Sequence, residues 1–263
     1  ENLLNLAINL LLMIRVGTDA QRLPPLQWTG GTLRQFASIR FSEPPQLEYE
    51  SVNLERSFNA WSVQAIAGIE VQFTDNIRDH LLLFDRDTKV YIFHHASFLE
   101  YHLSQGERSL LPLDVVNETL QTLALLFPQA DYTIPNRSNR VKRKWLSKMC
   151  AKSKKKHGGR TIDERVTRCG TPTSDSRKIQ NYKVWRDRLI ILKEAYDRET
   201  PTDIRQWWLD RRDGVRWYNF WCAILVLPVT AMFEFIQCIE GGIQAYYTVK
   251  GSPDVKKTDL YRG

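Results

Sequence analysis

A group of histidines is the first feature of the sequence that could support chemistry, because imidazole binds metals and transfers protons near neutral pH. Four of the five histidines in the chain lie within 23 residues, at His80, His94, His95 and His102. Their spacing matches none of the common metal-ligand patterns, and adjacent His94 and His95 would point to opposite faces of a strand. Asp85 and Asp87 fall in a predicted hairpin turn, where aspartate is favoured for backbone reasons. We therefore predict core or surface histidines.

Other catalytic motifs are lacking in the sequence. It carries no P-loop, no GxGxxG and no GxSxG pattern. The four cysteines form no CxxC pair, which argues against a zinc site or a disulfide framework and suits a reducing compartment. They are Cys150, Cys169, Cys222 and Cys238. We predict no enzymatic activity, no cofactor, and no catalytic, cofactor-binding or metal-binding residue.

The stretch from Trp217 to Tyr247 is the part of the chain best suited to crossing a bilayer. Its first 17 residues, up to Phe233, carry no charge. They would form about 25 Å of helix, against a hydrocarbon core of about 30 Å. Glu234 and Glu240 count against a span, because a carboxylate at the bilayer centre costs about 2.5–3.5 kcal/mol. A buried core helix is the alternative.

Aromatic residues flank this stretch, as they commonly flank membrane helices at the two interfaces. Pro228 also favours a span, since proline is tolerated in membrane helices and disfavoured in the middle of soluble ones. We predict a single transmembrane helix in contact with membrane lipids. The predicted anchoring residues are Trp217, Tyr218, Trp221, Phe233, Tyr246 and Tyr247.

A basic segment runs from Arg137 to Arg160, with eleven Lys or Arg and no Asp or Glu. The whole chain has a net charge of +7, so taking eleven from seven leaves −4 for the rest. Two clusters in the segment resemble a bipartite nuclear-import signal, and they equally suit anionic lipid headgroups or nucleic acid phosphates. A solvated charge run is the remaining alternative. The clusters are Lys142, Arg143, Lys144, Lys154, Lys155 and Lys156.

Residues 59–103 carry the clearest pattern of secondary structure. Alternating apolar and polar residues predict strands at 69–73 and 89–94, and apolar residues three or four apart predict a helix over 76–84. Further helices are predicted at 3–14, 32–41, 117–127 and 176–198. The predicted fold class is therefore α+β, mostly helical, with a small two-strand element.

These elements divide the chain into five predicted parts. A helical stalk is expected to run unbroken into the membrane helix. The parts are a globular α+β head at 1–132, a basic and flexible linker at 133–175, the stalk at 176–216, the transmembrane helix at 217–247 and a tail at 248–263.

The stretch from Glu55 to Glu100 resembles a large family of uncharacterised fungal proteins. The likeness rests on a Phe-Asn-Ala helix, an Ala-Gly-Ile strand, the segment FTDNIRDHL at 73–81 and an Ile-Phe-His-His strand. It extends to Leu120–Pro128, WRDRLIIL at 185–192, QWWLDRR at 206–212 and the apolar stretch at 217–247. The resemblance implies a C-terminal membrane helix and gives no activity. Family members usually have a small residue where this chain has Glu234.

We hypothesise a single-pass membrane protein that acts as an anchored, non-enzymatic interaction protein, with its head in the cytosol and a protein partner that the sequence does not identify. The alternative is a soluble nucleic-acid-binding or nuclear protein. It would use the basic segment Arg137 to Arg160 beside a winged-helix-like unit formed by 76–84 and the two strands. A hydrolase built on the histidines lacks a nucleophile motif.

Overall fold

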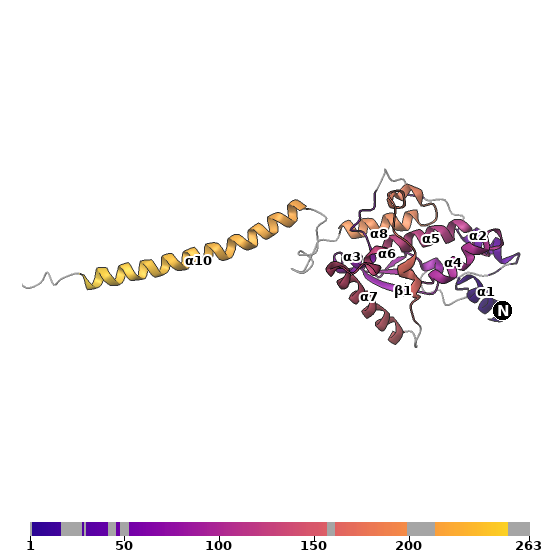
Figure 1. Ribbon diagram of the computed structural model, residues 1–263, viewed down its shortest axis with the longest axis horizontal. Helices are drawn as coiled ribbons and strands as arrows, with labels where there is room; N and C mark the ends of the chain where they lie inside the picture. The colour runs from indigo at the N-terminus through magenta and orange to yellow at the C-terminus, as the bar shows by residue number, and fades with distance from the viewer. Residues whose placement is uncertain are drawn as a thin grey trace, which may run out of the picture. The chain divides into compact units, whose positions relative to one another are not determined.

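The computed structural model describes residues 2–16, 28, 30–41, 46–47, 53–156, 161–198 and 214–251. The chain forms two compact units, Glu1–Leu209 and Asp210–Gly263. The first unit holds the described strands and every described helix except α10 (Figure 1). Its helices are α1 (Asn2–Leu12), α2 (Leu33–Phe41), α3 (Ala60–Ala65), α4 (Ala96–Gln105), α5 (Leu113–Leu126), α6 (Gln129–Thr133), α7 (Arg137–Lys156) and α8 (Arg186–Arg198).

A mixed three-stranded sheet lies in the first unit, in the order β1 (Glu70–Thr74), β3 (Lys89–Phe93), β2 (Leu83–Phe84). β1 and β3 run parallel, with Val71 opposite Val90, and β2 pairs antiparallel with β3. The two longer strands bury alternate residues over their first four positions, as their sequence pattern predicts. The α+β, mostly helical class is confirmed, and the sheet has one strand more than predicted.

The helix predicted over 76–84 is wrong. Asn76 caps only a 3-10 turn at Ile77–Asp79, and Leu81 has a φ of 59°, which a right-handed helix does not contain. The chain instead pairs with β3, because the backbone N–H of Leu81 donates to the Tyr91 carbonyl at 2.8 Å. A winged-helix-like unit therefore has no recognition helix at this position.

One cluster of buried apolar residues fills the first unit, and its largest side chains come from segments far apart in the sequence. The ring of Phe58 meets the ring of Tyr196 edge-on, with 5.4 Å between centroids. Phe73 stacks on Phe127, with 6.0 Å between centroids. Such contacts tie α8 and β1 into the same core. The head is therefore larger than the predicted 1–132, and it includes α7 and α8.

The segment predicted as a stalk, 176–216, belongs in its first part to this core. α8 begins only at Arg186, and it buries side chains that include Leu192 and Tyr196. The apolar residues at helical spacing are thus the buried face of a helix packed on the head. Residues 199–213, where the stalk would continue, lie outside the described residues.

Glu118 of α5 joins α8 to the rest of the head. Its buried carboxylate accepts backbone N–H bonds from Lys183, Val184 and Trp185 at 2.7, 2.8 and 3.2 Å, just before α8 begins. The indole N–H of Trp185 donates to the Thr119 hydroxyl at 2.9 Å. These N–H groups belong to the segment that leads into α8, and α5 supplies their acceptor.

The basic segment is a helix, α7, rather than the flexible linker predicted at 133–175. Ion pairs join α7 to the head: Lys142 lies 2.6 Å from Asp131, and Lys152 lies 2.5 Å from Glu70. Apolar residues one, three and four apart share one face of α7 and pack against the core. They are Trp145, Leu146, Met149 and Cys150. This packing is what holds so basic a segment in helical form.

In its described part, the second unit is the helix α10 (Gly214–Lys250), which has 37 residues. Its stretch Trp217–Lys250 is long and apolar enough to cross a membrane, and its most apolar part is not buried in the protein. Pro228 lies inside the helix. The prediction of one long apolar helix over 217–247 is confirmed.

Candidate functional site

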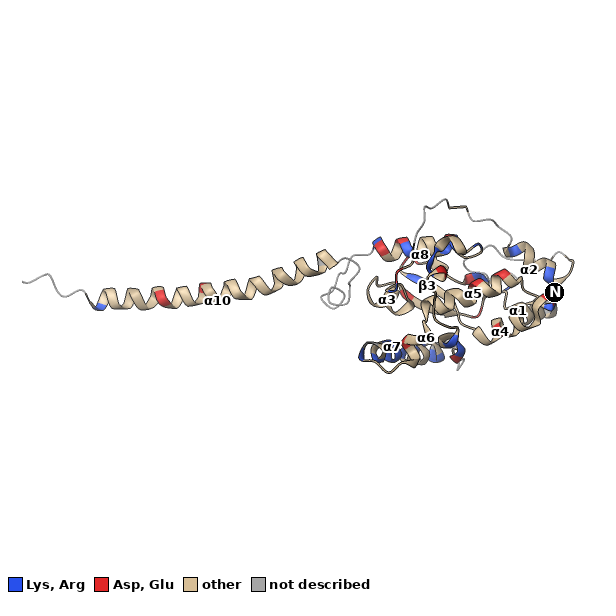
Figure 2. Cartoon of the chain, turned by 45° about the horizontal axis from the view of Figure 1, so that its top comes forward, with Lys and Arg blue, Asp and Glu red and all other residues tan. Residues whose placement is uncertain are grey.

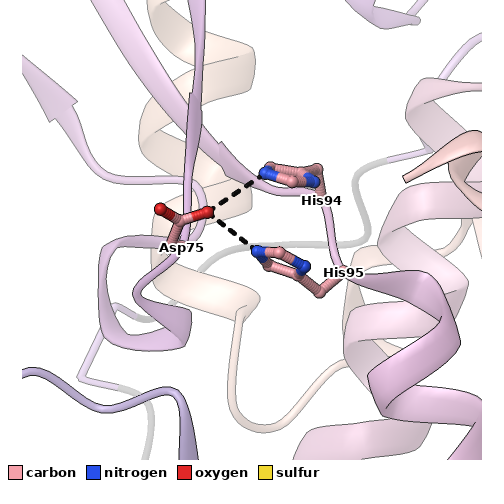
Figure 3. A group of neighbouring side chains, drawn as sticks. All are labelled: Asp75, His94 and His95. Carbon is pink, nitrogen blue, oxygen red and sulfur yellow. Dashed lines mark hydrogen bonds and ion pairs between the residues drawn. The ribbon is translucent and has the colours of Figure 1, made fainter. Parts of the chain in front are cut away.

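The ends of β1 and β3 bring three titratable side chains together. Because these strands are parallel neighbours, the residues that follow them lie at the same edge of the sheet. Asp75 follows β1, and His94 and His95 follow β3. Figure 3 shows both imidazole rings directed toward the Asp75 carboxylate. The Oδ1 atom of Asp75 lies 2.8 Å from Nε2 of His95 and 3.3 Å from Nε2 of His94.

The prediction that His94 and His95 point to opposite faces of a strand is wrong. β3 ends at Phe93, so strand alternation does not extend to the next two residues. Their ring centroids lie 4.0 Å apart. Sequence reasoning also missed Asp75, whose place becomes clear only once β1 and β3 are known to be parallel and adjacent.

Hydrogen bonds determine where His94 carries its proton. The backbone N–H of Asp163 donates to its Nδ1 atom at 3.2 Å, so Nδ1 has no proton. The proton of the neutral ring is therefore on Nε2, which donates toward Asp75. Burial lowers the pKa of His94, and this outweighs the bond to Asp75, which acts in the opposite direction. A neutral His94 is the form that fits both neighbours.

Asp75 is the charged member of the group. Hydrogen bonds from His94 and then from His95 hold the pKa of its carboxyl well below the usual range, although partial burial opposes them. The side chains of Asp75 and His95 are 38% and 26% exposed, so the group reaches water on one side. Two hollows of the described surface, one along α2 and one between β1 and α7, are lined by other residues.

The three side chains have the composition of a metal site, and their ligand atoms lie within 4.8 Å of one another. The bond from Asp163 argues against metal binding in this arrangement. A neutral histidine that binds metal through Nε2 carries its proton on Nδ1 and donates that proton to an acceptor. At His94, the group that faces Nδ1 is the backbone N–H of Asp163. Metal binding through Nε2 would put a proton on Nδ1, so two N–H donors would face each other without an acceptor.

We expect Zn²⁺ at about 0.1 mM to leave the melting temperature of the head unchanged. A ligand raises the melting temperature only of a folded protein that binds it, and we expect no binding here. Differential scanning fluorimetry of a truncation ending at Arg212, which keeps the whole head and its core, gives the measurement. The His95→Ala variant is the control. A rise in Tm that occurs in the unaltered chain and disappears in His95→Ala would contradict the expectation.

His80 is fully buried in the core, apart from the other histidines. Its Nε2 atom lies 2.7 Å from the Thr122 hydroxyl, and its Nδ1 atom accepts the backbone N–H of Phe93 at 3.2 Å. Burial, followed by the nearby positive charge of Arg188, lowers the pKa of His80 to about 3. His80 is thus a neutral core residue, as the sequence analysis predicts.

This burial predicts acid sensitivity. The pKa of His80 is lower in the folded than in the unfolded chain, so the unfolded chain binds more protons as the pH falls below about 6.5. Stability is therefore highest above that pH and falls by about 1.4 kcal/mol per pH unit for this one group. Urea unfolding of the head at pH 7, 6, 5 and 4 measures the slope. We expect His80→Gln to be less stable at pH 7 and to lose stability less steeply; equal slopes would contradict the assignment.

The remaining residues of the histidine group do not join a site. Nδ1 of His102 lies 3.0 Å from the Ser109 hydroxyl, which itself donates to the Leu111 carbonyl. Burial lowers the pKa of His102. Asp85 and Asp87 lie in the predicted turn, with φ angles of 55° and 64°. The structure therefore brings together only two of the four histidines.

α7 presents a cationic face to solvent, which Figure 2 shows as a run of Lys and Arg along the helix. Of the six predicted residues, Lys142 is turned to the head and paired with Asp131, Arg143 is half-buried, and the side chain of Lys156 is not described. The cationic face consists of exposed residues that form no ion pair with the described part of the chain. They are Arg137, Arg140, Lys144, Lys148, Lys154 and Lys155.

The predicted anchoring residues lie on α10, and four of them form two aromatic pairs near its ends. The rings of Trp217 and Trp221 are 6.3 Å apart, and those of Tyr246 and Tyr247 are 5.7 Å apart. Thirty residues of helix between Trp217 and Tyr247 correspond to about 45 Å, which is close to the thickness of a bilayer with its headgroups. Tyr218 and Phe233 are exposed on the same helix.

Comparison of the chain with protein-family models, with curated proteins and with solved structures found no match. The resemblance to the fungal family therefore stays a prediction. The features of the molecule that bear on its function are α10, the cationic face of α7 and the group formed by Asp75, His94 and His95.

Proposed function

We propose that α10 anchors the protein in a membrane as a single transmembrane helix. The observation that carries the proposal is the exposure of an apolar helix: Leu225, Leu227 and Phe235 are 66%, 70% and 68% exposed. Apolar surface costs about 25 cal/mol per Å² in water, and large exposed apolar patches mark contact with a membrane or another protein. The alternative, a core helix, would be mostly buried.

The head lies on the cytosolic side in this proposal. Lys and Arg close to the span give little bias, with five in 198–216 and four in 250–262. The cationic face of α7 favours the cytosol, because the cytosolic leaflet is anionic. Only 15 residues, 199–213, separate α8 from α10, and an extended chain of that length reaches at most about 54 Å. The anchor thus keeps the head near the membrane surface.

Alkaline carbonate extraction tests the anchor. The full chain is expressed in cells beside the truncation ending at Arg212, and both are followed in the membrane pellet and the supernatant. We expect the full chain to stay in the pellet and the truncation to be released. A full chain that is released with the truncation would show that α10 is not embedded in the bilayer.

The cationic face gives the head a second contact, with the phosphate groups of anionic lipids. Each Lys or Arg near an anionic surface contributes about 1 kcal/mol. A truncation ending at Arg212 should therefore bind vesicles that contain phosphatidylserine, and it should bind more weakly as salt is raised. Vesicles of phosphatidylcholine alone should not bind it.

Charge reversal tests this lipid contact. We expect Lys144→Glu with Lys148→Glu to weaken binding of the head to phosphatidylserine vesicles by about 30-fold or more, since two attractions of about 1 kcal/mol are lost. The control, Arg34→Glu with Arg108→Glu, changes the net charge equally at exposed positions outside α7. Equal losses in both variants, measured by co-sedimentation, would show that net charge and not α7 sets the binding.

The proposed role is that of an anchored interaction protein without enzymatic activity. The arrangement of Asp75, His94 and His95 supports this, because the bonds that His94 and His95 form with Asp163 and Asp75 hold both imidazoles within the head. Nucleic acid is the second candidate ligand, favoured by the same cationic face. Nucleic acid would replace lipid as the proposed ligand if the head bound duplex DNA or RNA at 150 mM salt and did not bind anionic vesicles. The protein would then be a soluble or nuclear one.

A further inference from the structure

Most of the polar residues in the second half of α10 lie on one side of the helix, while Glu240 lies about 100° away from Gly241. A helix turns by about 100° per residue, so positions spaced four and three apart stay on one face. The seam defined by this spacing contains four polar side chains and one glycine. Its residues are Thr230, Glu234, Gln237, Gly241 and Gln244.

The opposite side of the same stretch is apolar. About half or more of each of these side chains is exposed. They are Met232, Phe235, Ile239 and Ile243. α10 therefore has a lipid-compatible face and a polar seam, and the seam occupies the half of the span in which uncharged apolar residues would be expected all round.

The seam needs a partner inside the membrane. Thr230 donates its hydroxyl to the Val226 carbonyl of its own helix at 2.9 Å, but Glu234, Gln237 and Gln244 have no side-chain partner in the part of the chain that the structure describes. Polar side chains in the hydrocarbon region are costly, and they face other protein groups rather than lipid. No other described helix of this chain is long and apolar enough to cross a membrane.

We infer that the seam pairs with the seam of a second copy of this protein, so that two α10 helices associate in parallel. The inference rests on the proposed span. All copies of a single-pass protein insert with one orientation, so two α10 helices that meet are parallel. Each seam residue then lies opposite the same residue of the other copy. Alternating spacings of four and three average 3.5 residues. This repeat keeps two helices in contact when they wind around each other in a left-handed supercoil.

The chemistry of the seam is self-complementary. Gln237 has an amide NH₂ that donates and Glu234 has a carboxylate that accepts, so each Gln237 can bond Glu234 of the other copy one layer away. The amides of two Gln244 residues can donate to and accept from each other. Gly241 lies between these layers, and a small residue there lets the two backbones approach closely.

Two adjacent glycines provide a matched test. Gly241 lies in the seam, and Gly242 lies about 100° away from it. A Cβ atom added at either glycine meets nothing within 4 Å, so both positions have room for the first atom of a side chain. Full chains carrying donor and acceptor fluorophores at the C-terminus are placed in phosphatidylcholine vesicles, and energy transfer is followed as lipid is added.

We expect energy transfer in the unaltered chain to fall with dilution as a reversible pair dissociates. Gly241→Ile should weaken the association by about tenfold or more, and Gly242→Ile should leave it unchanged. Gln237→Leu should weaken it as well, since a polar contact is lost. No transfer above random encounter, or equal effects of the two glycine variants, would overturn the pair. Release of the unaltered chain from the carbonate-resistant pellet would overturn the span itself, which separates the two failures.

Discussion

Two arginines in the middle of the uncharged stretch Trp217–Phe233 of α10, at Leu225 and Leu227, are expected to move the protein from the membrane pellet to the soluble fraction. Each arginine at the centre of a span costs about 2.5–3.5 kcal/mol and also removes the favourable contribution of a leucine. The two together cost about 6–8 kcal/mol, which is large against the insertion free energy of one moderately apolar helix. Carbonate extraction of the full chain measures the result.

The control for this variant places the same two charges at the ends of the helix, as Val215→Arg with Val249→Arg. Arginines near the interface reach the headgroups, so this chain should stay in the pellet. If the central and the terminal pair behaved alike, the position of the charges in the bilayer would not matter, and α10 would not be a span. Comparison of the two variants thus shows whether the depth of the charges in the bilayer, and not the net charge of the protein, determines the result.

Removal of the Glu118 carboxylate should strongly destabilise the head. Glu118→Ala leaves the N–H groups of Lys183, Val184 and Trp185 without their acceptor at the start of α8. A partly buried donor that loses its partner costs about 1–3 kcal/mol, so we expect a loss of about 3–5 kcal/mol in the free energy of unfolding. That is a large part of the stability of a typical domain.

Urea unfolding of the truncation ending at Arg212 measures this effect. Glu118→Gln keeps one acceptor oxygen and should lose less, and Glu107→Ala removes an exposed carboxylate and should change stability by less than about 0.5 kcal/mol. A Glu118→Ala variant as stable as Glu107→Ala would show that the three bonds do not hold α8 on the head.

The sequence predicts the elements that depend on local pattern. The strand at 70–74 alternates apolar and polar residues, and α10 is a long apolar run with aromatic ends, so both follow from periodicity and length. The helix over 76–84 fails because pairing with β3 overrides the apolar spacing. Leu81 and Asp85 adopt positive φ, which no apolar periodicity indicates.

The two errors in the basic and stalk segments have a shared physical cause. The prediction treats the charges of α7 as a solvated run, but a narrow apolar stripe that includes Trp145 and Met149 is enough to pack the helix on the core. The buried face of α8 likewise needs the acceptor of Glu118, 65 residues or more away in the sequence. Such contacts are long-range, and periodicity does not reveal them.

The candidate site lies beyond sequence reasoning for a similar reason. Asp75 and the pair His94 and His95 meet only because β1 and β3 are parallel neighbours. A usable signal exists, since each of the two predicted strands is followed within two residues by a titratable side chain. Using that signal requires the parallel pairing of the two strands, which the prediction leaves unspecified although the 15 residues between the predicted strands are enough for a parallel connection.

Protease protection in sealed microsomes tests the central claim, that α10 crosses the membrane, most directly. One epitope is placed before Glu1 and another after Gly263 of the full chain, and protease is added outside the vesicles with and without detergent. We predict that the tag on the head is digested at once, and that the tag after α10 is protected until detergent opens the vesicle. Digestion of both tags without detergent, or protection of both, would place the two ends of α10 on one side of the membrane and contradict the account.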